Sequence, residues 1–298
     1  MVLAAGLGTR LKPYTDLVPK PLVPLLGVPC IDYSLMQLPS AGVAEAVVNV
    51  HAHSRKLVDH LHQSATREGL KIRISDESSL LLGSAGGYRK ALSLLESEPG
   101  VSEPFFALNA DVVSAVDLRA LAQRHAELKK NHDVWMTLCI ASGAMLESQD
   151  GAYTEILLDH STGLVTGTGA KKNRVPFYTG TAVFETGCFR HLPEGVPSEF
   201  VPEVLLPLIA RGKVGFFSVD QLWLDVGSPL LWWKSHFELQ NEREQGKIPP
   251  FWTRAMQEHQ GEFRISVDEG IVDYEPSSPV PEARAKNWIR YRGVTTDV

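Results

Sequence analysis

Phosphate-binding chemistry is suggested by the start of the chain, where a short apolar run leads directly into closely spaced glycines. The residues concerned are Leu3, Ala4, Ala5, Gly6, Gly8, Thr9 and Arg10. Glycines after a strand let backbone N–H groups approach an anion, and a threonine hydroxyl and an arginine fork add further donors. The third glycine of the dinucleotide motif would fall at Leu11, and the G-K-[ST] of a P-loop does not follow. The pattern predicts a phosphate-binding turn, with a purely structural turn as the alternative.

A lysine between two prolines follows these glycines. Pro19 and Pro21 bracket Lys20, so the backbone on both sides of the lysine has a fixed φ. A lysine held in this way beside a glycine turn is suited to neutralise phosphate charge. The alternative is a solvated loop lysine.

Five motifs in order resemble those of the sugar-1-phosphate nucleotidyltransferases, also called NDP-sugar pyrophosphorylases. The compact group of N-acetylmuramate-1-phosphate uridylyltransferases and mannose-1-phosphate guanylyltransferases is the most similar. The resemblance extends to about residue 240. The motifs are LAAGLGTRLKPYT with PKPLVPLLGVP, the loop LGSAGGY at 82–88, LNAD at 108–111, FYTGTAVF at 177–184 and WLDVGSP at 223–229.

The resemblance implies which residues bind the two substrates. It implies a nucleotide site made by Leu3, Ala4, Ala5, Gly6, Gly8, Thr9, Arg10, Lys20, Gly83, Gly86, Gly87 and Asn109. It implies a sugar site made by Gly151, Lys171, Asn173, Gly180 and Thr181. The family often has a Glu-Lys pair before the glycine-containing strand, but this sequence reads GAKKN at 169–173, so the identity of the sugar is left open. Taken alone, the loop at 82–88 also fits a helix N-terminus capped by Ser84.

Two aspartates at matching motif positions are implied to hold Mg²⁺. Asp111 and Asp225 lie 114 positions apart, so only tertiary folding can bring them together. Mg²⁺ prefers carboxylate oxygens together with substrate phosphates and water. A lone aspartate after a strand is more often a helix cap or turn residue.

The implied reaction is NTP plus sugar 1-phosphate giving NDP-sugar plus pyrophosphate. The attacking phosphate oxygen is already an anion, so the reaction needs no general base, and the sequence offers no convincing Ser-His or Cys-His set. Catalysis would depend on positioning and charge neutralisation, with Arg10, Lys20, Asp111 and Asp225 as the catalytic residues. The nucleotide is expected to be UTP or GTP.

The elements that must position these residues alternate between strand-like and helix-like segments. Such alternation predicts an α/β fold with a Rossmann-like, mostly parallel sheet flanked by helices, and ligands at the carboxyl ends of its strands. Residues 141–192, rich in Gly and Thr with short strands, predict a small antiparallel sugar-binding patch or lid over that sheet. We expect a nucleotidyltransferase domain at 1–245 and a Pro-rich, aperiodic extension at 246–298 that wraps the domain or forms an interface.

The net charge, the lengths of the apolar stretches and the cysteine spacing argue against several classes of protein. Lys and Arg total 29 against 35 Asp and Glu, a net charge of −6, which argues against a nucleic-acid partner. No apolar stretch is long enough for a membrane span, and three cysteines without CxxC spacing fit a reducing cytoplasm. The expected partners are the NTP and the sugar 1-phosphate, with a homodimer as the expected assembly.

Two other functions remain open from the sequence. A nucleotide or sugar-nucleotide sensor without turnover would account for Ala110, where the family usually has glycine, and for the missing glutamate. Cytidylyl transfer to a phospho-alcohol such as phosphocholine would need an aromatic and acidic pocket, for which Tyr153, Glu155 and Tyr178 are candidates.

Overall fold

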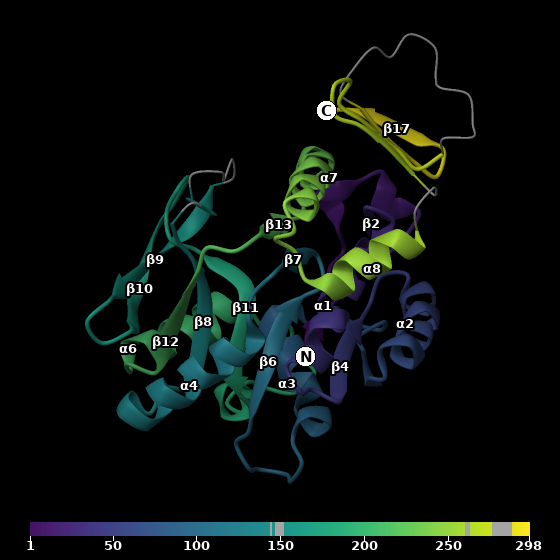
Figure 1. Ribbon diagram of the computed structural model, residues 1–298. Coiled ribbons are helices and arrows are strands. Elements are labelled where there is room, and N and C mark those ends of the chain that lie inside the picture. The colour runs from purple at the N-terminus through teal and green to yellow at the C-terminus, as the bar shows by residue number, and fades with distance from the viewer. Residues whose placement is uncertain (144, 147–151, 260–262, 276–287) are drawn as a thin grey trace.

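One central sheet is built from nine strands that lie between residues 2 and 219, and helices connect several of these strands (Figure 1). The computed structural model describes residues 1–143, 145–146, 152–259, 263–275 and 288–298, without the side chains of 66–68. In spatial order the strands are β5 (Lys71–Asp76), β4 (Glu45–Val50), β1 (Val2–Leu3), β6 (Pro104–Asn109), β11 (Tyr178–Glu185), β8 (Met136–Ala141), β12 (Val214–Val219), β10 (Leu164–Lys172) and β9 (Tyr153–Asp159).

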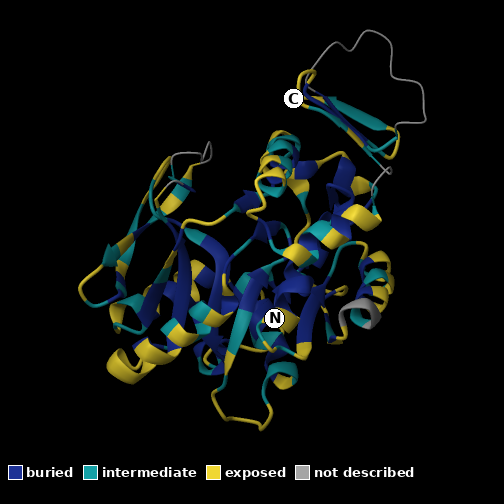
Figure 2. Ribbon diagram, in the orientation of Figure 1, coloured by how far each residue is buried: buried dark blue, intermediate teal, exposed yellow. Residues whose placement is uncertain are grey.

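Helices cover both faces of this sheet and bury two apolar clusters against it. One cluster takes side chains from α1 (Cys30–Ser40), α2 (Ser54–Glu68) and α4 (Leu118–His132). The other takes side chains from α3 (Gly83–Leu95) and α6 (Leu206–Ala210). Figure 2 shows the central strands as the most buried part of the molecule. This three-layer arrangement confirms the predicted α/β fold class.

Strand direction in the sheet is mixed but mainly of one sense. The pairings β5–β4, β4–β1, β1–β6 and β8–β12 are parallel, whereas β10 and β11 run opposite to the other strands. The antiparallel pairing expected within 141–192 is therefore present, but its predicted position as a lid over the sheet is wrong. β9 and β10 extend the edge of the sheet, and β11 lies in its middle, because their backbone groups complete the ladders of β12, β6 and β8.

Several further elements lie outside the central sheet. They are the pairs β2 (Pro24–Leu25) with β3 (Val28–Pro29) and β7 (Val112–Ser114) with β13 (Trp223–Asp225), the helix α7 (Pro229–Glu244), the 3₁₀ turns Thr9–Leu11, Tyr14–Asp16, Lys20–Leu22 and Thr186–Phe189, and a π turn at Val201–Leu205. Among the described residues, every helix is too short or too polar to span a bilayer.

The C-terminal part of the chain is more regular than its sequence suggested. It contains α8 (Pro250–Glu258) and a four-stranded sheet, here called the C-terminal sheet: β14 (Arg264–Ser266), β15 (Ile271–Asp273), β16 (Trp288–Tyr291) and β17 (Val294–Asp297). Sequence reasoning did not predict this regular structure in the described residues of the extension. Pro249 and Pro250 lie at the start of α8, where a helix tolerates proline, and strands of three or four residues are too short to show a clear alternation.

Candidate functional site

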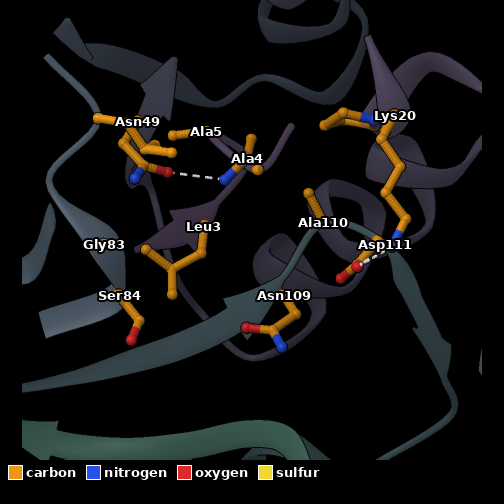
Figure 3. A pocket seen from close by; sticks show the side chains of 13 residues that line it. Leu3, Ala4, Ala5, Lys20, Asn49, Gly83, Ser84, Asn109, Ala110 and Asp111 are labelled. Carbon is orange, nitrogen blue, oxygen red and sulfur yellow. Dashed lines mark hydrogen bonds and ion pairs between the residues drawn. The ribbon is translucent and has the colours of Figure 1, made fainter. Parts of the chain in front are cut away.

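The carboxyl ends of three neighbouring strands form the floor of a pocket of about 290 Å³ (Figure 3). Leu3 of β1 is in register with Asn49 of β4 on one side and Asn109 of β6 on the other. The pocket is lined by Leu3, Ala4, Ala5, Gly6, Lys20, Pro21, Asn49, Leu81, Gly83, Ser84, Asn109, Ala110 and Asp111. Much of the predicted nucleotide site is thus brought together at the edge where α/β sheets bind ligands.

The glycine turn is folded back on the residues that follow it. Gly8 adopts a left-handed conformation (φ 64°) immediately before the turn Thr9–Leu11. The Thr15 hydroxyl donates to the Gly8 carbonyl at 2.9 Å. A Cβ placed on Gly8 would lie 2.8 Å from Thr15 Cγ2 and 3.0 Å from Lys20 Cβ. Glycine at position 8 therefore allows the turn to pack against the lysine segment.

Lys20 is a nearly buried cation, not a solvated loop lysine. Its side chain is 9% exposed, and its ammonium group donates to an oxygen of Asp111. Figure 3 shows these two side chains pointing toward each other at one end of the pocket, with Gly83 and Ser84 at the other end. The predicted cation thus faces the pocket from a rigid position, which excludes the alternative of a solvated lysine.

Asp111 and Asp225 are brought together by the short pair β7–β13. Asp225 is in register with Val112, and the N–H of Val226 donates to the Asp111 carbonyl at 3.1 Å. Burial raises the pKa of the Asp225 carboxyl and the Asp111 carboxylate raises it further, whereas Lys20 and Arg10 lower it. Two carboxylates therefore share a partly dehydrated site that favours a positive ion.

Arg10 and Tyr153 complete the surroundings of Asp225. A Cβ on Gly227 would lie 2.7 Å from Asp225 Oδ1 and 2.9 Å from Arg10 Nη2, so glycine lets the guanidinium approach the carboxylate. The Tyr153 hydroxyl lies 3.4 Å from Asp225 Oδ2. Arg10 is exposed, as is Thr9, and neither lines the pocket described above.

The second glycine loop supplies the wall opposite Lys20. Its first residues, Gly83 and Ser84, line the pocket, and the backbone N–H groups of Ala85 and Gly86 donate to the Ser198 carbonyl. The Ser84 hydroxyl accepts a hydrogen bond from the N–H of Phe200, so the alternative of Ser84 as the N-cap of α3 is wrong.

Gly86 and Gly87 support this wall from behind. Neither lines the pocket. A Cβ on Gly87 would lie 3.0 Å from both Asn49 Nδ2 and Glu77 Oε1.

Sequence reasoning missed Asn49 and Glu77. Asn49 accepts from the N–H of Ala4 at 2.7 Å and donates to Glu77, which is fully buried and also accepts from the N–H of Leu82. The network joins the end of β1 to the second glycine loop. The sequence offered one signal for Asn49, which is a polar residue near the end of the β-branched strand at 46–50. Asn109 has the same position in its own strand.

The predicted sugar-site residues are only partly brought together. Gly180 of β11 packs on the Asn109 side chain, and Thr181 is buried beside it. A second pocket of about 240 Å³ adjoins the first through Leu3, Ser84 and Asn109, and Tyr178 lines it.

The remaining predicted sugar-site residues lie elsewhere. Lys171 and Asn173 are exposed and line neither pocket, and Gly151 lies outside the described residues.

Residues 1–156, slightly more than half of the chain, match the nucleotidyl transferase family. The chain is 33% identical over 241 residues to N-acetylmuramate alpha-1-phosphate uridylyltransferase of Caulobacter vibrioides, an alignment that covers 77% of this chain and 91% of that protein. It is 30% identical to the enzyme of the same name from Neisseria meningitidis, over 76% of this chain and 92% of that protein. The chain belongs to the nucleotidyl transferase family. The predicted family and enzyme class are confirmed.

Two further proteins similar to this chain differ more from it in length or sequence. A probable mannose-1-phosphate guanylyltransferase of Oryza sativa is 28% identical over 77% of this chain, which spans 61% of that protein. The crystal structure of HddC from Yersinia pseudotuberculosis superposes with a TM-score of 0.63 at 20% identity, covering 80% of this chain and 97% of that one. The structural likeness supports the fold.

A divalent cation fits the acidic pair of this nucleotidyltransferase. Among the described residues, no group of three or more His, Cys, Asp or Glu side chains is placed to hold a metal on its own. Mg²⁺, however, commonly takes one or two carboxylates and completes its shell with substrate phosphates and water. Asp111 and Asp225, close enough for one carboxylate to raise the pKa of the other, provide that donor set.

Proposed function

We propose that this nucleotidyltransferase transfers a nucleotidyl group from UTP or GTP to a sugar 1-phosphate and releases pyrophosphate. The observation that carries the proposal is the pairing of nearly buried Lys20 with Asp111 in a strand-end pocket, with Asp225 and Arg10 directly beside them. The names of the similar enzymes, which are uridylyl- and guanylyltransferases, support the choice of nucleotides.

Residues of the chain itself neutralise the phosphate charge and align the two substrates. A phosphate oxygen of the sugar 1-phosphate attacks the α-phosphorus of the NTP, and the bond from that phosphorus to the β-phosphate bridging oxygen breaks. Lys20 and Arg10 offset the negative charge of the two polyanions as they approach. The nucleophile is already ionised, so no side chain has to remove a proton from it.

Mg²⁺ is the proposed metal, held by Asp111 and Asp225. When bound, the ion supplies Lewis-acid stabilisation of phosphate charge. Lys20 donates to Asp111 and orients its carboxylate, and the hydroxyl of Tyr153 and the guanidinium of Arg10 limit the positions open to Asp225.

The nucleotide and the sugar are assigned to neighbouring parts of the strand edge. We assign the nucleotide to the pocket between Leu3 and Gly83, and the sugar phosphate to the side of β11 near Gly180 and Thr181. Lys171 and Asn173 would reach the sugar only by a change of side-chain position, because both are exposed at the end of β10.

Phospho-alcohol chemistry has less support. The three residues suggested for a quaternary-ammonium pocket have other contacts: Tyr153 stacks on Phe177, Glu155 pairs with Lys172, and Tyr178 lines the second pocket. The sensor alternative also has less support, because two carboxylates and two basic side chains lie together at the proposed site. A cytoplasmic location and a homodimer stay predictions.

Pyrophosphate release with Mg²⁺ over a panel of NTPs and sugar 1-phosphates tests the proposal. Turnover restricted to UTP or GTP with one class of sugar 1-phosphate is the expected result. Nucleotide binding without turnover across the whole panel would contradict it and favour the sensor. Turnover with CTP and phosphocholine instead would establish phospho-alcohol transfer.

A further inference from the structure

The segment that carries Lys20, residues 14–24, is held near its start by the C-terminal sheet. Tyr14 is fully buried, and its hydroxyl lies 2.7 Å from Thr296 Oγ1 of β17 and 3.1 Å from the Ile289 carbonyl of β16. Its ring meets the Trp232 ring edge-on, with centroids 4.9 Å apart. A strand pair almost at the end of the chain therefore fixes a residue six positions before Lys20.

The same sheet holds the segment at its other end. The carbonyl of Pro24, four residues after Lys20, accepts hydrogen bonds from the Tyr274 hydroxyl at 3.1 Å and from the Trp232 ring N–H at 2.7 Å. Tyr274 directly follows β15, and its hydroxyl also lies 2.7 Å from His236 Nε2 of α7. Lys20 thus lies between two anchor points that both come from the C-terminal sheet.

A buried ion pair sets the spacing between these anchor points. Arg290 donates to both oxygens of Asp273, at 2.8 and 2.7 Å, and both side chains are almost completely buried. Asp273 immediately precedes Tyr274, and Arg290 immediately follows Ile289. The bidentate pair joins β15 to β16 at the two residues adjoining the anchors, so the anchors move as one body.

Contacts lead from the first anchor to the glycine turn. Thr15, next to Tyr14, donates to the Gly8 carbonyl and packs where a Cβ of Gly8 would lie. Lys20 packs on the same glycine and reaches Asp111. Displacement of Tyr14 would therefore move the turn and the lysine together relative to Asp111.

We propose that the C-terminal sheet acts as a clamp on residues 14–24 and that Tyr14 and Tyr274 are positioning residues for Lys20. The catalytic consequence rests on the proposed function. The claim that the sheet orders the turn and the lysine segment does not depend on the proposed function. The C-terminal sheet lies outside residues 1–156, the part of the chain that matches the family model.

The test compares Tyr14→Phe with Trp233→Phe. Tyr14→Phe removes only the anchoring hydroxyl. Trp233→Phe removes a hydrogen bond of 2.8 Å from α7 to the Gly270 carbonyl, which also joins the C-terminal sheet to the rest of the chain but does not involve residues 14–24. Tyr14→Phe loses the two contacts of its hydroxyl with the sheet, and Trp233→Phe loses one hydrogen bond and part of its ring, so both variants weaken the docking of the same sheet.

Steady-state kinetics and hydrogen exchange are measured on both full-length variants at a temperature where circular dichroism shows each fully folded. For Tyr14→Phe we expect kcat to fall on the order of tenfold and KM for the NTP to rise, because Lys20 is displaced. Loss of folded protein would lower kcat alone. Trp233→Phe should stay within about twofold of wild type. Without substrate, amides of residues 9–22 should exchange faster in Tyr14→Phe only.

Three results would overturn the clamp: wild-type kcat in Tyr14→Phe, equal losses in the two variants, or unchanged exchange over residues 9–22 in Tyr14→Phe. Absence of turnover in the wild-type protein is a different outcome. It contradicts the proposed function, and the exchange comparison then still decides whether the C-terminal sheet orders the lysine segment.

Discussion

Replacing Gly8 by alanine tests whether the glycine turn is fitted to the lysine segment. An alanine at φ 64° costs about 1–2 kcal/mol in backbone strain. Its Cβ would also lie 2.8 Å from Thr15 Cγ2 and 3.0 Å from Lys20 Cβ, and overpacking of this kind costs about 1–3 kcal/mol more. We therefore expect Gly8→Ala to lower the free energy of unfolding by about 2–5 kcal/mol, as the sum of these two effects.

Gly42→Ala is the matched control. Gly42 also has a positive φ of 82°, but a Cβ there would meet nothing within 4 Å. This variant should lose only the strain component, about 1–2 kcal/mol. Urea denaturation followed by circular dichroism measures both variants under the same conditions.

Thr15→Ser in the Gly8→Ala background separates contact from strain. A serine keeps the hydroxyl that bonds Gly8 and removes the methyl that the new Cβ would meet. The double variant should recover part of the lost stability. Pyrophosphate release should fall by up to about 10²-fold in Gly8→Ala, because the alanine displaces Lys20 from Asp111. Equal stabilities of Gly8→Ala and Gly42→Ala, with wild-type turnover in the former, would refute the reasoning.

Three further predictions concern charge, metal and pH. Lys20→Ala and Asp111→Ala should each lower pyrophosphate release by at least about 10²–10³-fold while far-ultraviolet circular dichroism stays native; full activity in either would contradict their assignment. Chelation of divalent ions should abolish turnover, and added Mg²⁺ should restore it. Asp225→Asn should need a higher Mg²⁺ concentration for its half-maximal rate. Turnover unaffected by chelation would exclude the metal role. Burial acts to raise the pKa of Glu185, but hydrogen bonds from His125 and Lys129 outweigh it and hold the pKa at about 2, below its ordinary value of 4.5. Stability from this group is complete above pH 4.5 and is lost as the pH falls toward 2, by at most about 3 kcal/mol. Urea unfolding at pH 6 and pH 3 should show this loss in the wild-type protein and a smaller loss in Glu185→Gln, and equal losses would contradict it.

Local sequence determined the elements and much of the pocket. The apolar run before Gly6, the prolines around Lys20 and the strand ending before Asp111 each specify backbone conformation over a few residues. Steric limits on φ and strand periodicity act at that range. Parallel strands align their carboxyl ends, and for this reason the glycine turn and Asp111 could be expected at one edge of the sheet. The motif resemblance added Gly83, Asn109 and Asp225 to this site, and no local rule brings Asp225 close to Asp111.

Only the tertiary structure decided how distant segments complete the site. The β7–β13 register places Asp225 beside Asp111. The place of β11 between β6 and β8, and the Asn49–Glu77 network behind the second glycine loop, depend on which strands pair. The C-terminal sheet gave little signal because its strands are short, yet it anchors Tyr14 more than 270 positions away. Such contacts follow from packing and hydrogen-bond satisfaction across the whole chain, and spacing along the sequence does not encode them.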